Sequence, residues 1–265
     1  LNAALHGTFL NNRLSLQLNA YKAETDNLLT LQKLSYLTGL EHYWGNGGAM
    51  SNQGFDLSLN GRVIVTRDWQ WELGFSLGHY RNEITSLPAT DGSMDTELYG
   101  ATVRSQVGQA AGVFYGYRSL GVFSTSEEAA AAALYQVESN GTHTYFAAGD
   151  VHFADLDGNH CIDEADRTII GDPNPDFYGN IFTSVNWKNL TLSAAFNYSL
   201  GNDVYNYMRS QLEGGNRFMN QTTAMVNRWQ MEGQPTNMPR ATFQDPMGNS
   251  RFSDRWIEDG SYLRL

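Results

Sequence analysis

Several long stretches of this chain alternate strictly between apolar and polar side chains. In LSLQLNAY, residues 14–21, Leu14, Leu16 and Leu18 alternate with polar residues, and the same period of two recurs in FDLSLNG (55–61), WQWELGFSLGHY (69–80) and LTLSAAFNYSL (190–200). Successive side chains of a β-strand point to opposite faces of a sheet, whereas a helix repeats about every 3.6 residues. The pattern therefore predicts an all-β fold with one apolar and one polar sheet face.

Two kinds of connection join these strands. The short polar turns LNNR (10–13), VTRDW (65–69) and WKNL (187–190) predict tight hairpins. Four long insertions, which we expect to be irregular, lie at about residues 28–52, 84–105, 117–176 and 203–259, far beyond the usual connection of roughly 4–6 residues. Short turns at one end and long loops at the other are typical of antiparallel outer-membrane β-barrels.

Two architectures explain the alternation. The apolar face lies in the core of a soluble antiparallel sandwich, but it faces lipid in a transmembrane barrel. Two details favour the barrel. The polar positions carry mainly Asn, Ser, Gln, Thr and Gly rather than Lys and Glu, and aromatic residues stand at strand ends, as in interfacial girdles: Tyr21, Trp69, Tyr80 and Trp187.

The composition limits the possible partners. The formal net charge is -11 and the 17 basic residues are scattered, so no nucleic-acid partner is expected, because such a face needs clustered Lys and Arg. Cys161 is the only cysteine, which leaves neither an intrachain disulfide nor a cysteine-based zinc site. No apolar run of about 18 residues predicts a transmembrane helix. The chain begins at Leu1 without a signal-like stretch, so we expect a mature or excised segment.

One short helix is expected inside the third insertion. The stretch STSEEAAAAALYQ, residues 124–136, offers Ser124 or Thr125 as N-cap and Glu127 or Glu128 as the reciprocal partner of a capping box. The alanine run that follows has a high helix propensity but little apolar side chain to bury. We therefore expect a surface helix within a long loop.

The stretch DLDGNHCIDEAD, residues 155–166, is dense in oxygen ligands. Calcium binds about six to eight oxygens, which an EF-hand-type loop supplies from positions 1, 3, 5, 7, 9 and 12, the seventh through its backbone carbonyl. Those positions hold Asp155, Asp157, Asn159, Cys161, Asp163 and Asp166. The spacing predicts a structural Ca²⁺ site formed by these residues, with Cys161 binding through its backbone carbonyl.

This loop departs from the EF-hand pattern in two places. His160 stands where such loops carry a sharp-turn glycine, and position 12 is Asp rather than the longer bidentate Glu. An acidic turn that makes Asx-type backbone bonds would explain the same residues without a metal. We expect His160 to face solvent and the Cys161 thiol to pack nearby.

Nothing in the sequence predicts catalysis. No Gly-x-Ser-x-Gly elbow occurs, and the loop carboxylates are too crowded for separate acid and base roles, so no catalytic residue is assigned. Arg228, Trp229 and Arg240 are expected to be structural. Some aromatic residues of the insertions could stack on sugar rings or could simply pack within the loops: Tyr43, Trp44, Tyr115, Tyr117 and Trp229.

Two stretches resemble a known family. GDVHFADLDGNHCIDEADRTIIGDPNPDFYGNI (149–181) and SDRWIEDGSYLRL (253–265) are similar to the C-terminal part of SusC/RagA-type TonB-dependent outer-membrane transporters of Bacteroidetes. Four further stretches match, and all the stretches occur in the same order as in the family: YKAETDNLL (21–29), NGGAMSNQGFDLSL (46–59), GQAAGVFYGYRSLGVF (108–123) and GNDVYN (201–206). The chain departs from the family at Asp56, where Glu is usual, and at His160, which replaces the loop glycine.

The resemblance implies a 22-stranded antiparallel barrel with a plugged lumen, long extracellular loops and one short loop helix. Residues 1–265 would be a C-terminal portion of this barrel, without the plug, the early strands or the final strands, and residues 149–176 would be a calcium-loop-like insertion in an extracellular loop. The missing plug and final strands would explain why the chain lacks a signal at Leu1 and stops at YLRL.

The resemblance also implies a function and partners. The protein would import a large nutrient, an oligosaccharide or an oligopeptide, across the bacterial outer membrane together with a SusD-like surface lipoprotein. TonB would act through the plug outside this chain, outer-membrane lipid would surround the strands, and no enzyme activity is implied. The alternative is a soluble, calcium-stabilised β-sandwich that binds carbohydrate or mediates adhesion.

Overall fold

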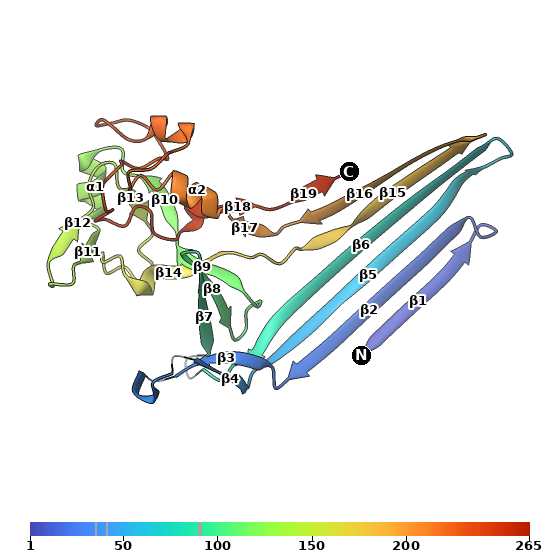
Figure 1. Cartoon of the computed structure of the whole chain (residues 1–265), viewed down its shortest axis with the longest axis horizontal. Coiled ribbons are helices and arrows are strands. Elements are labelled where there is room, and N and C mark those ends of the chain that lie inside the picture. The colour runs from blue at the N-terminus through green and yellow to red at the C-terminus, as the bar shows by residue number, and fades with distance from the viewer. Residues whose placement is uncertain (35, 41, 90–91) are drawn as a thin grey trace.

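A single antiparallel sheet dominates the structure, a computed structural model that describes residues 1–34, 36–40, 42–89 and 92–265. Its strands follow the order β1–β2–β5–β6–β15–β16–β19 (Figure 1). They span β1 (Asn2–Phe9), β2 (Leu14–Asp26), β5 (Ala49–Val65), β6 (Trp69–Ser86), β15 (Phe177–Trp187), β16 (Leu190–Leu200) and β19 (Tyr262–Arg264). The antiparallel β fold predicted from the alternation is confirmed, and each alternating stretch lies in one of these strands.

The register gives this sheet two different faces. On the face that we call the apolar face, Leu5, Leu18, Leu57 and Leu77 form one continuous row across β1, β2, β5 and β6. The neighbouring residues along these strands point to the opposite face, which we call the polar face. There the register aligns Gln17, Ser58, Ser76, Asn180 and Asn197 in one row. The period of two in the sequence thus becomes a sheet that is apolar on one side and polar on the other.

The apolar face is open to the surroundings. Leu192 is 71% exposed, and Leu18 and Phe75 are each 39% exposed. A β-sandwich would bury these side chains against a second sheet. No second sheet among the described residues covers this face, which agrees with the wall of a barrel.

The three predicted hairpin turns lie together at one end of the sheet (Figure 1). Near this end Trp69 and Trp187 stack on the apolar face, with ring centroids 5.6 Å apart. The expectation that Tyr21 and Tyr80 belong to the same kind of girdle is wrong, because both pair with Gly54 on the polar face. Each tyrosine lies an odd number of residues from the apolar positions of its strand, so its side chain points to the opposite face.

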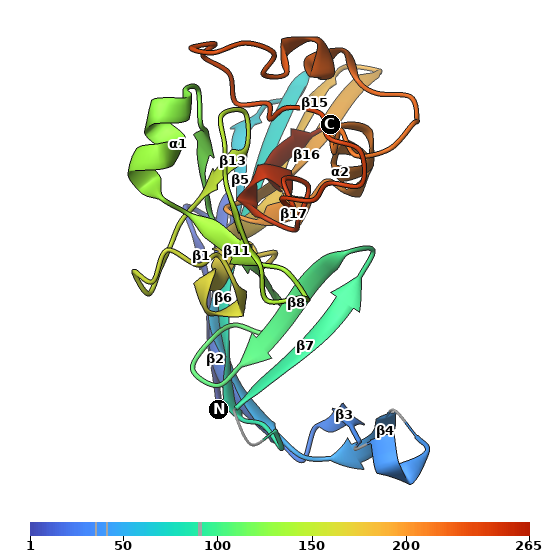
Figure 2. The same cartoon turned by 90° about the vertical axis from the view of Figure 1, so that its left-hand side faces the viewer.

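Three of the long insertions fold into a lobe at the opposite end of the sheet, whereas the first insertion forms a separate hairpin at that end (Figures 1 and 2). The expectation that they are irregular is wrong for much of their length, because they form small antiparallel sheets that satisfy their backbone hydrogen bonds. It is confirmed for residues 213–252, which contain no strand. The strands are β3 (Leu29–Lys33), β4 (His42–Asn46), β7 (Ser93–Leu98), β8 (Ala101–Gln106), β9 (Val113–Tyr117), β10 (Ser119–Val122), β11 (Tyr135–Val137), β12 (His143–Tyr145), β13 (Val151–Phe153), β14 (Arg167–Gly171), β17 (Asp203–Tyr205) and β18 (Ile257–Asp259).

The predicted helix forms, although it is shorter than expected. α1 spans Ser126–Ala132, with Thr125 as N-cap and Glu128 completing the capping box. It ends at Ala133, which adopts a left-handed conformation with φ of 52°, and Gln136 belongs to β11 instead. No helix in the described part of the chain is long and apolar enough to cross a membrane.

A second α-helix, α2 (Tyr207–Leu212), was not predicted. Its N-cap is Asn206, whose side-chain oxygen accepts a hydrogen bond from the backbone N–H of Arg209 at 2.9 Å. Single turns of 3₁₀-helix occur at η1 (Tyr36–Thr38), η2 (Glu164–Asp166), η3 (Thr223–Asn227) and η4 (Asp254–Trp256). A six-residue helix offers too few apolar positions for a periodic pattern to show in the sequence.

The main core of the described residues lies in the lobe rather than on the sheet. α1 contributes Ala129, and β13 contributes Val151 and Phe153, both fully buried. The remaining members of this cluster are Phe123, Leu134, Phe146, Ile162 and Met247, with Tyr117 and Ala132 packed against it. The lobe therefore has its own hydrophobic core, and the sheet depends on its surroundings to cover the apolar face.

A glycine in β15 tests the strand pairing. A Cβ atom at Gly179 would lie 2.0 Å from the backbone oxygen of Ser76, so the β6–β15 pair would have to separate. We expect Gly179→Ala to lower the free energy of unfolding by about 1–3 kcal/mol. Thermal unfolding of the full-length protein in detergent measures this change.

Gly61→Ala is the matched control, because a Cβ atom at Gly61 meets only Leu14 Cδ1 at 3.7 Å. Equal unfolding temperatures for the two variants would contradict the close approach of β6 and β15 at Gly179.

Candidate functional site

The predicted calcium loop connects β13 to β14 on the surface of the lobe. Its backbone is held by its own side chains. Asp155 accepts hydrogen bonds from the N–H groups of Gly158 at 2.8 Å and His160 at 2.9 Å, and Asp157 accepts one from Asn159 at 3.1 Å. The Asx-type bonds considered from the sequence are therefore present.

Three of the predicted ligands converge. Asp155, Asp157 and Asp166 each offer one carboxylate oxygen, and these atoms lie within 4.8 Å of one another. Asp166 is fully buried, and its two oxygens accept the N–H groups of Leu156 at 2.7 Å and Asp163 at 2.9 Å. Burial opposes ionisation of Asp155, but the N–H donors of His160 and Gly158 outweigh it and lower the pKa of this carboxyl group. Hard oxygen ligands in such a group suit Ca²⁺.

The other three predicted ligands make contacts within the loop. The side-chain oxygen of Asn159 accepts from the N–H of Cys161 at 2.6 Å, and Asp163 caps η2 by accepting from Ala165 at 2.8 Å. Cys161 forms a bridge with Tyr135 of β11, and its thiol is buried as expected, with only 8% of the residue exposed. Burial, assisted by Asp163, raises the pKa of this thiol.

His160 adopts the backbone conformation of the glycine that it replaces. Its φ is 63°, in the left-handed region that glycine occupies without steric cost. The residue is exposed, as predicted, and its ring Nδ1 lies 3.1 Å from the carbonyl oxygen of Ala132, at the end of α1. The sequence departure is therefore a point of backbone strain, in a residue type that tolerates this region better than most.

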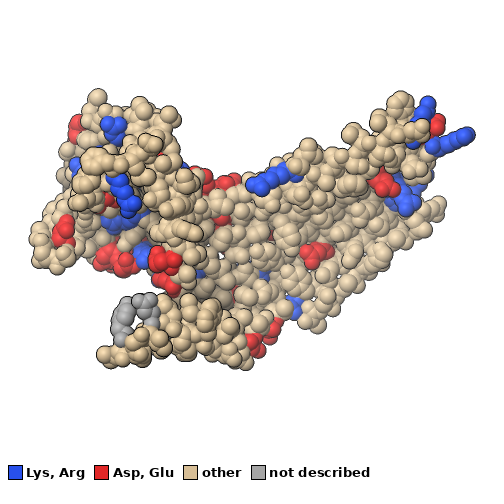
Figure 3. Space-filling view, viewed as in Figure 1, with Lys and Arg blue, Asp and Glu red and all other residues tan. Residues whose placement is uncertain are grey.

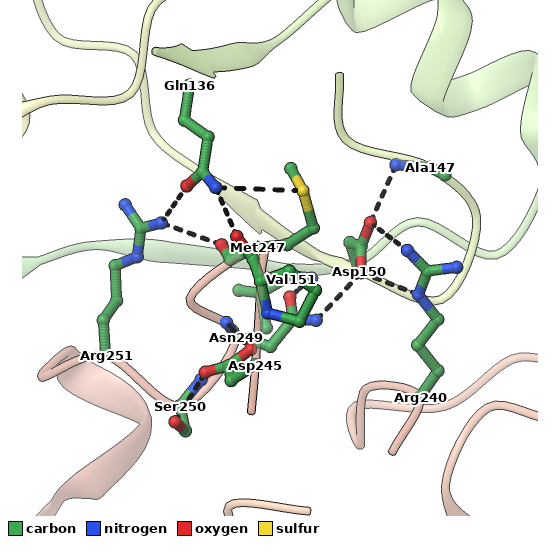
Figure 4. Close-up of polar contacts among 11 residues, drawn as sticks. Gln136, Ala147, Asp150, Val151, Arg240, Asp245, Met247, Asn249, Ser250 and Arg251 are labelled. Atoms are coloured by element: carbon green, nitrogen blue, oxygen red, sulfur yellow. Dashed lines mark hydrogen bonds and ion pairs between the residues drawn. The ribbon is translucent and has the colours of Figure 1, made fainter. Parts of the chain in front are cut away.

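An ion pair beside this loop, with one fully buried and one partly exposed partner, connects distant segments of the lobe (Figure 4). Asp150 is fully buried, and Arg240 binds it through two parallel hydrogen bonds of 2.8 Å. Asn249 donates to the same carboxylate at 2.8 Å and accepts the N–H of Val151 at 2.8 Å. One carboxylate thus joins β13 to segments about 90 and 100 residues further along the chain.

Arg251 makes a second set of contacts next to the ion pair (Figure 4). It donates to the side chain of Gln136 at 2.9 Å and to the carbonyl oxygen of Met247 at 2.8 Å. Its guanidinium also lies over the rings of Tyr117 and Phe153. Burial lowers the pKa of this guanidinium, an effect that Tyr117 opposes. The sequence offered no signal for the contact with Gln136, because the two residues are more than 100 positions apart.

The structure separates the loop aromatics into two groups. Tyr43 and Trp44 of β4 are 42% and 66% exposed. In contrast, Arg104 covers the ring of Tyr115 at 3.3 Å, and Trp229 donates to the carbonyl oxygen of Ser124 at 3.0 Å while packing beside Gly149. Tyr117 packs beneath Arg251. Only the first pair is thus open to a ligand among the five residues considered.

The two-faced sheet and its lobe define a class of protein. A broad antiparallel sheet with an open apolar face, a polar face, short turns at one end and folded loops at the other has the architecture of an outer-membrane β-barrel wall. Figure 3 shows few charged side chains over the wide middle of the sheet, as this class requires.

Comparisons with known proteins agree with this class. No model of a known protein family matches the chain. The TonB-dependent receptor P3 of Formosa agariphila is 32% identical over 270 residues, which cover 100% of this chain and 26% of that receptor. The TonB-dependent receptor SusC of Bacteroides thetaiotaomicron is 28% identical over 284 residues, covering 99% of this chain and 24% of SusC.

Solved structures show the same fold. The RagAB peptide importer in its closed-closed state superposes with a TM-score of 0.76 at 23% identity, covering 100% of this chain and 27% of the importer chain. The chain is thus related over its whole length to the SusC/RagA family of TonB-dependent receptors, and its sheet is part of such a barrel. It spans about a quarter of the length of these relatives.

The ion pair can be tested by removing one charge. Asp150→Asn leaves the Arg240 guanidinium, whose side chain is 33% exposed, without its counterion, and we expect this change to destabilise the lobe by about 1–3 kcal/mol. Protease cleavage of the lobe and thermal unfolding of the full-length protein measure the effect.

Glu164→Gln is the control, because Glu164 pairs with Arg167 but has a side chain that is 80% exposed. We expect this change to cost less than about 1 kcal/mol. Similar losses for the two variants would show that the pair of Asp150 and Arg240 does not hold the lobe.

Proposed function

We propose that this chain forms part of the wall and the extracellular lobe of a TonB-dependent transporter in the bacterial outer membrane. The transporter imports a large nutrient, an oligosaccharide or an oligopeptide, with a SusD-like surface lipoprotein as partner. TonB supplies the driving force through a part of the protein outside this chain. The observation that carries the proposal is the continuous apolar face of a sheet whose other face is polar.

The dimensions of the apolar face suit a membrane. From Trp69 to His79 the strand β6 advances ten residues, or about 33 Å at roughly 3.3 Å per residue, and a tilt of about 40° reduces this to about 25 Å. That height matches the apolar band of outer-membrane barrels. The polar face, rich in Asn, Ser and Gln, would then line the lumen through which a hydrated nutrient passes.

The lobe suits the recognition of a partner and a ligand. Phe218 and Phe243 are 93% and 60% exposed, with ring centroids 5.0 Å apart. Neighbouring large apolar side chains exposed on a lobe favour contact with another protein. Tyr43 and Trp44 offer aromatic surface to a sugar or a peptide. The relatives' names, TonB-dependent receptor and peptide importer, favour transport over catalysis.

Paired substitutions in β5 test the orientation of the sheet. Ser58 and Leu59 are adjacent, but they lie on the polar and the apolar face respectively, and Leu59 pairs with Phe75 near the middle of the apolar band. In the full-length transporter we expect Leu59→Arg to destabilise the barrel by about 2–4 kcal/mol, because the charge enters the middle of the lipid layer, and to reduce assembly in the outer membrane. We expect Ser58→Arg to assemble normally.

The same cells report on import. We expect deletion of the gene to abolish growth on an oligosaccharide or a peptide mixture too large for porins, and the Ser58→Arg protein, but not the Leu59→Arg protein, to restore it. The lipoprotein should co-purify with the restored transporter. Growth that does not depend on the gene or on TonB would contradict the proposed function, and equal assembly of both variants would contradict the lipid-facing orientation.

We also propose that the loop at residues 155–166 binds Ca²⁺ and braces the lobe. Three convergent carboxylates with Asx-bonded backbone support this role, since an ion that joins them would offset the entropy of ordering the loop. Asp155, Asp157 and Asp166 would form the inner set, and Asn159, Asp163 and the carbonyl oxygen of Cys161 would complete the coordination after small rotations.

A calcium titration tests this site. We expect Asp155→Asn to weaken binding about tenfold or more, because it removes a charged ligand. His160→Gly should strengthen binding about fivefold, because it relieves left-handed strain of about 1 kcal/mol when the loop becomes ordered. Isothermal titration and the protease sensitivity of the loop with and without a chelator measure these effects.

Glu164→Gln is the control, because it removes a loop carboxylate at a position that supplies no ligand. The calcium site is refuted if Asp155→Asn and Glu164→Gln bind calcium alike, or if the unsubstituted protein shows no saturable binding.

A further inference from the structure

Charged side chains follow the apolar face at the end of the sheet that is next to the lobe, and they are arranged in rows. The last row of the apolar face consists of Ala20, Phe55 and His79 on β2, β5 and β6, with the His79 ring packed beside that of Phe55. The next row on the same face is Lys22, Gln53 and Arg81. The row after that is Glu24, Ser51 and Glu83. Moving away from the apolar band, two cations are therefore followed by two carboxylates.

These two rows line one open groove, together with Asp26. Arg81 and Glu83 are exposed, whereas Asn82 and Ile84, which alternate with them along β6, are buried at 8% and 4% exposure. Ile84 donates its N–H to the carbonyl oxygen of Gln109 of the lobe at 2.9 Å. The lobe thus covers the polar face at this level, and the groove lies on the side that meets the membrane.

The separation of the charged rows leaves room for a lipid headgroup. Two residues along a strand separate the rows by about 6.7 Å, and two strand spacings separate the Lys22 and Arg81 backbones by about 9.6 Å. A phosphate group fits between two such cations, with the Gln53 amide as a further donor. An ammonium group one row further out would meet Glu24 and Glu83.

We propose that this groove binds an outer-leaflet lipid whose headgroup is phosphoethanolamine. In that headgroup the phosphate lies next to the apolar part and the ammonium lies outermost, which is the complement of the order on the protein. Lys22 and Arg81 bind the phosphate, and Glu24 and Glu83 accept hydrogen bonds from the ammonium. The inference rests on the proposed function, because it requires the apolar face to meet lipid.

A bound headgroup can replace the ion pair that the groove already contains. Lys22 and Glu24 are paired at 2.9 Å, but their side chains are 52% and 66% exposed. Such exposed pairs contribute little to stability, so a headgroup can replace each partner at small cost. Other headgroups match less well, because phosphoglycerol has no ammonium and the ammonium of phosphocholine has no N–H donor.

The test uses the full-length transporter purified in detergent and titrated with dihexanoyl phosphatidylethanolamine, phosphatidylglycerol or phosphatidylcholine, with bound lipid counted by native mass spectrometry. We expect phosphatidylethanolamine to bind about tenfold more tightly than the other two lipids. Lys22→Gln/Arg81→Gln should weaken binding of all three lipids about tenfold, since each cation near a membrane surface contributes a similar attraction. Glu24→Gln/Glu83→Gln should abolish only the preference for phosphatidylethanolamine.

Lys188→Gln is the control, because Lys188 is an exposed cation in the turn at the opposite end of the same sheet. The inference is overturned if the three lipids bind equally, or if the control variant behaves like Lys22→Gln/Arg81→Gln. A transporter that stays in solution without detergent would overturn the proposed function as well, so the two failures are distinguishable.

Discussion

The pairing of β5 with β6 is the constraint on which the rest of the structure depends. These strands of 17 and 18 residues place Leu57 opposite Leu77 and Ser58 opposite Ser76. Because side chains alternate between faces, a slip of one residue would turn apolar side chains into the lumen and polar ones into lipid. The position of the lobe follows from the same pairing, since both strands extend beyond the apolar band, where Ile84 and Asn82 meet the loops.

The lobe must be stabilised against the entropic cost of ordering its long loops. Its segments are joined by long loops, and ordering such loops has a large entropic cost. A hydrophobic core around Val151 and Phe153, the ion pair of Asp150 and Arg240, and the contacts of Arg251 together offset this cost. The proposed calcium loop begins two residues after β13, which carries part of this core. Binding an ion there would stiffen the same region, so loop order and partner recognition would be coupled.

The proposed functions share one arrangement of charge. The middle of the sheet presents apolar side chains on one face and neutral polar ones on the other, which suits lipid outside and a hydrated path inside. Charged residues gather where water returns, in the rows of Lys22 and Glu24 on the outside and in the lobe beyond them. The exposed pair of Lys22 and Glu24 and the fully buried carboxylate of Asp150 therefore have different roles. Water screens the charges of the exposed pair, but it does not screen the charge of Asp150.

The sequence by itself determined the features that depend on near neighbours: the strands, the tight turns, the capping box of α1 and the spacing of the acidic loop. The alternation alone fitted both a barrel and a sandwich, and the neutral polar positions together with the family resemblance favoured the barrel. Only the tertiary structure decided which carboxylates converge, that Tyr21 and Tyr80 face the polar side, and that Asp150 binds Arg240. These features depend on the register of the strands and on contacts between segments that are far apart in the chain. Asp150 and Arg240, for example, are separated by 90 residues. No periodic pattern in the sequence links such segments, so packing in the folded protein selects the partner.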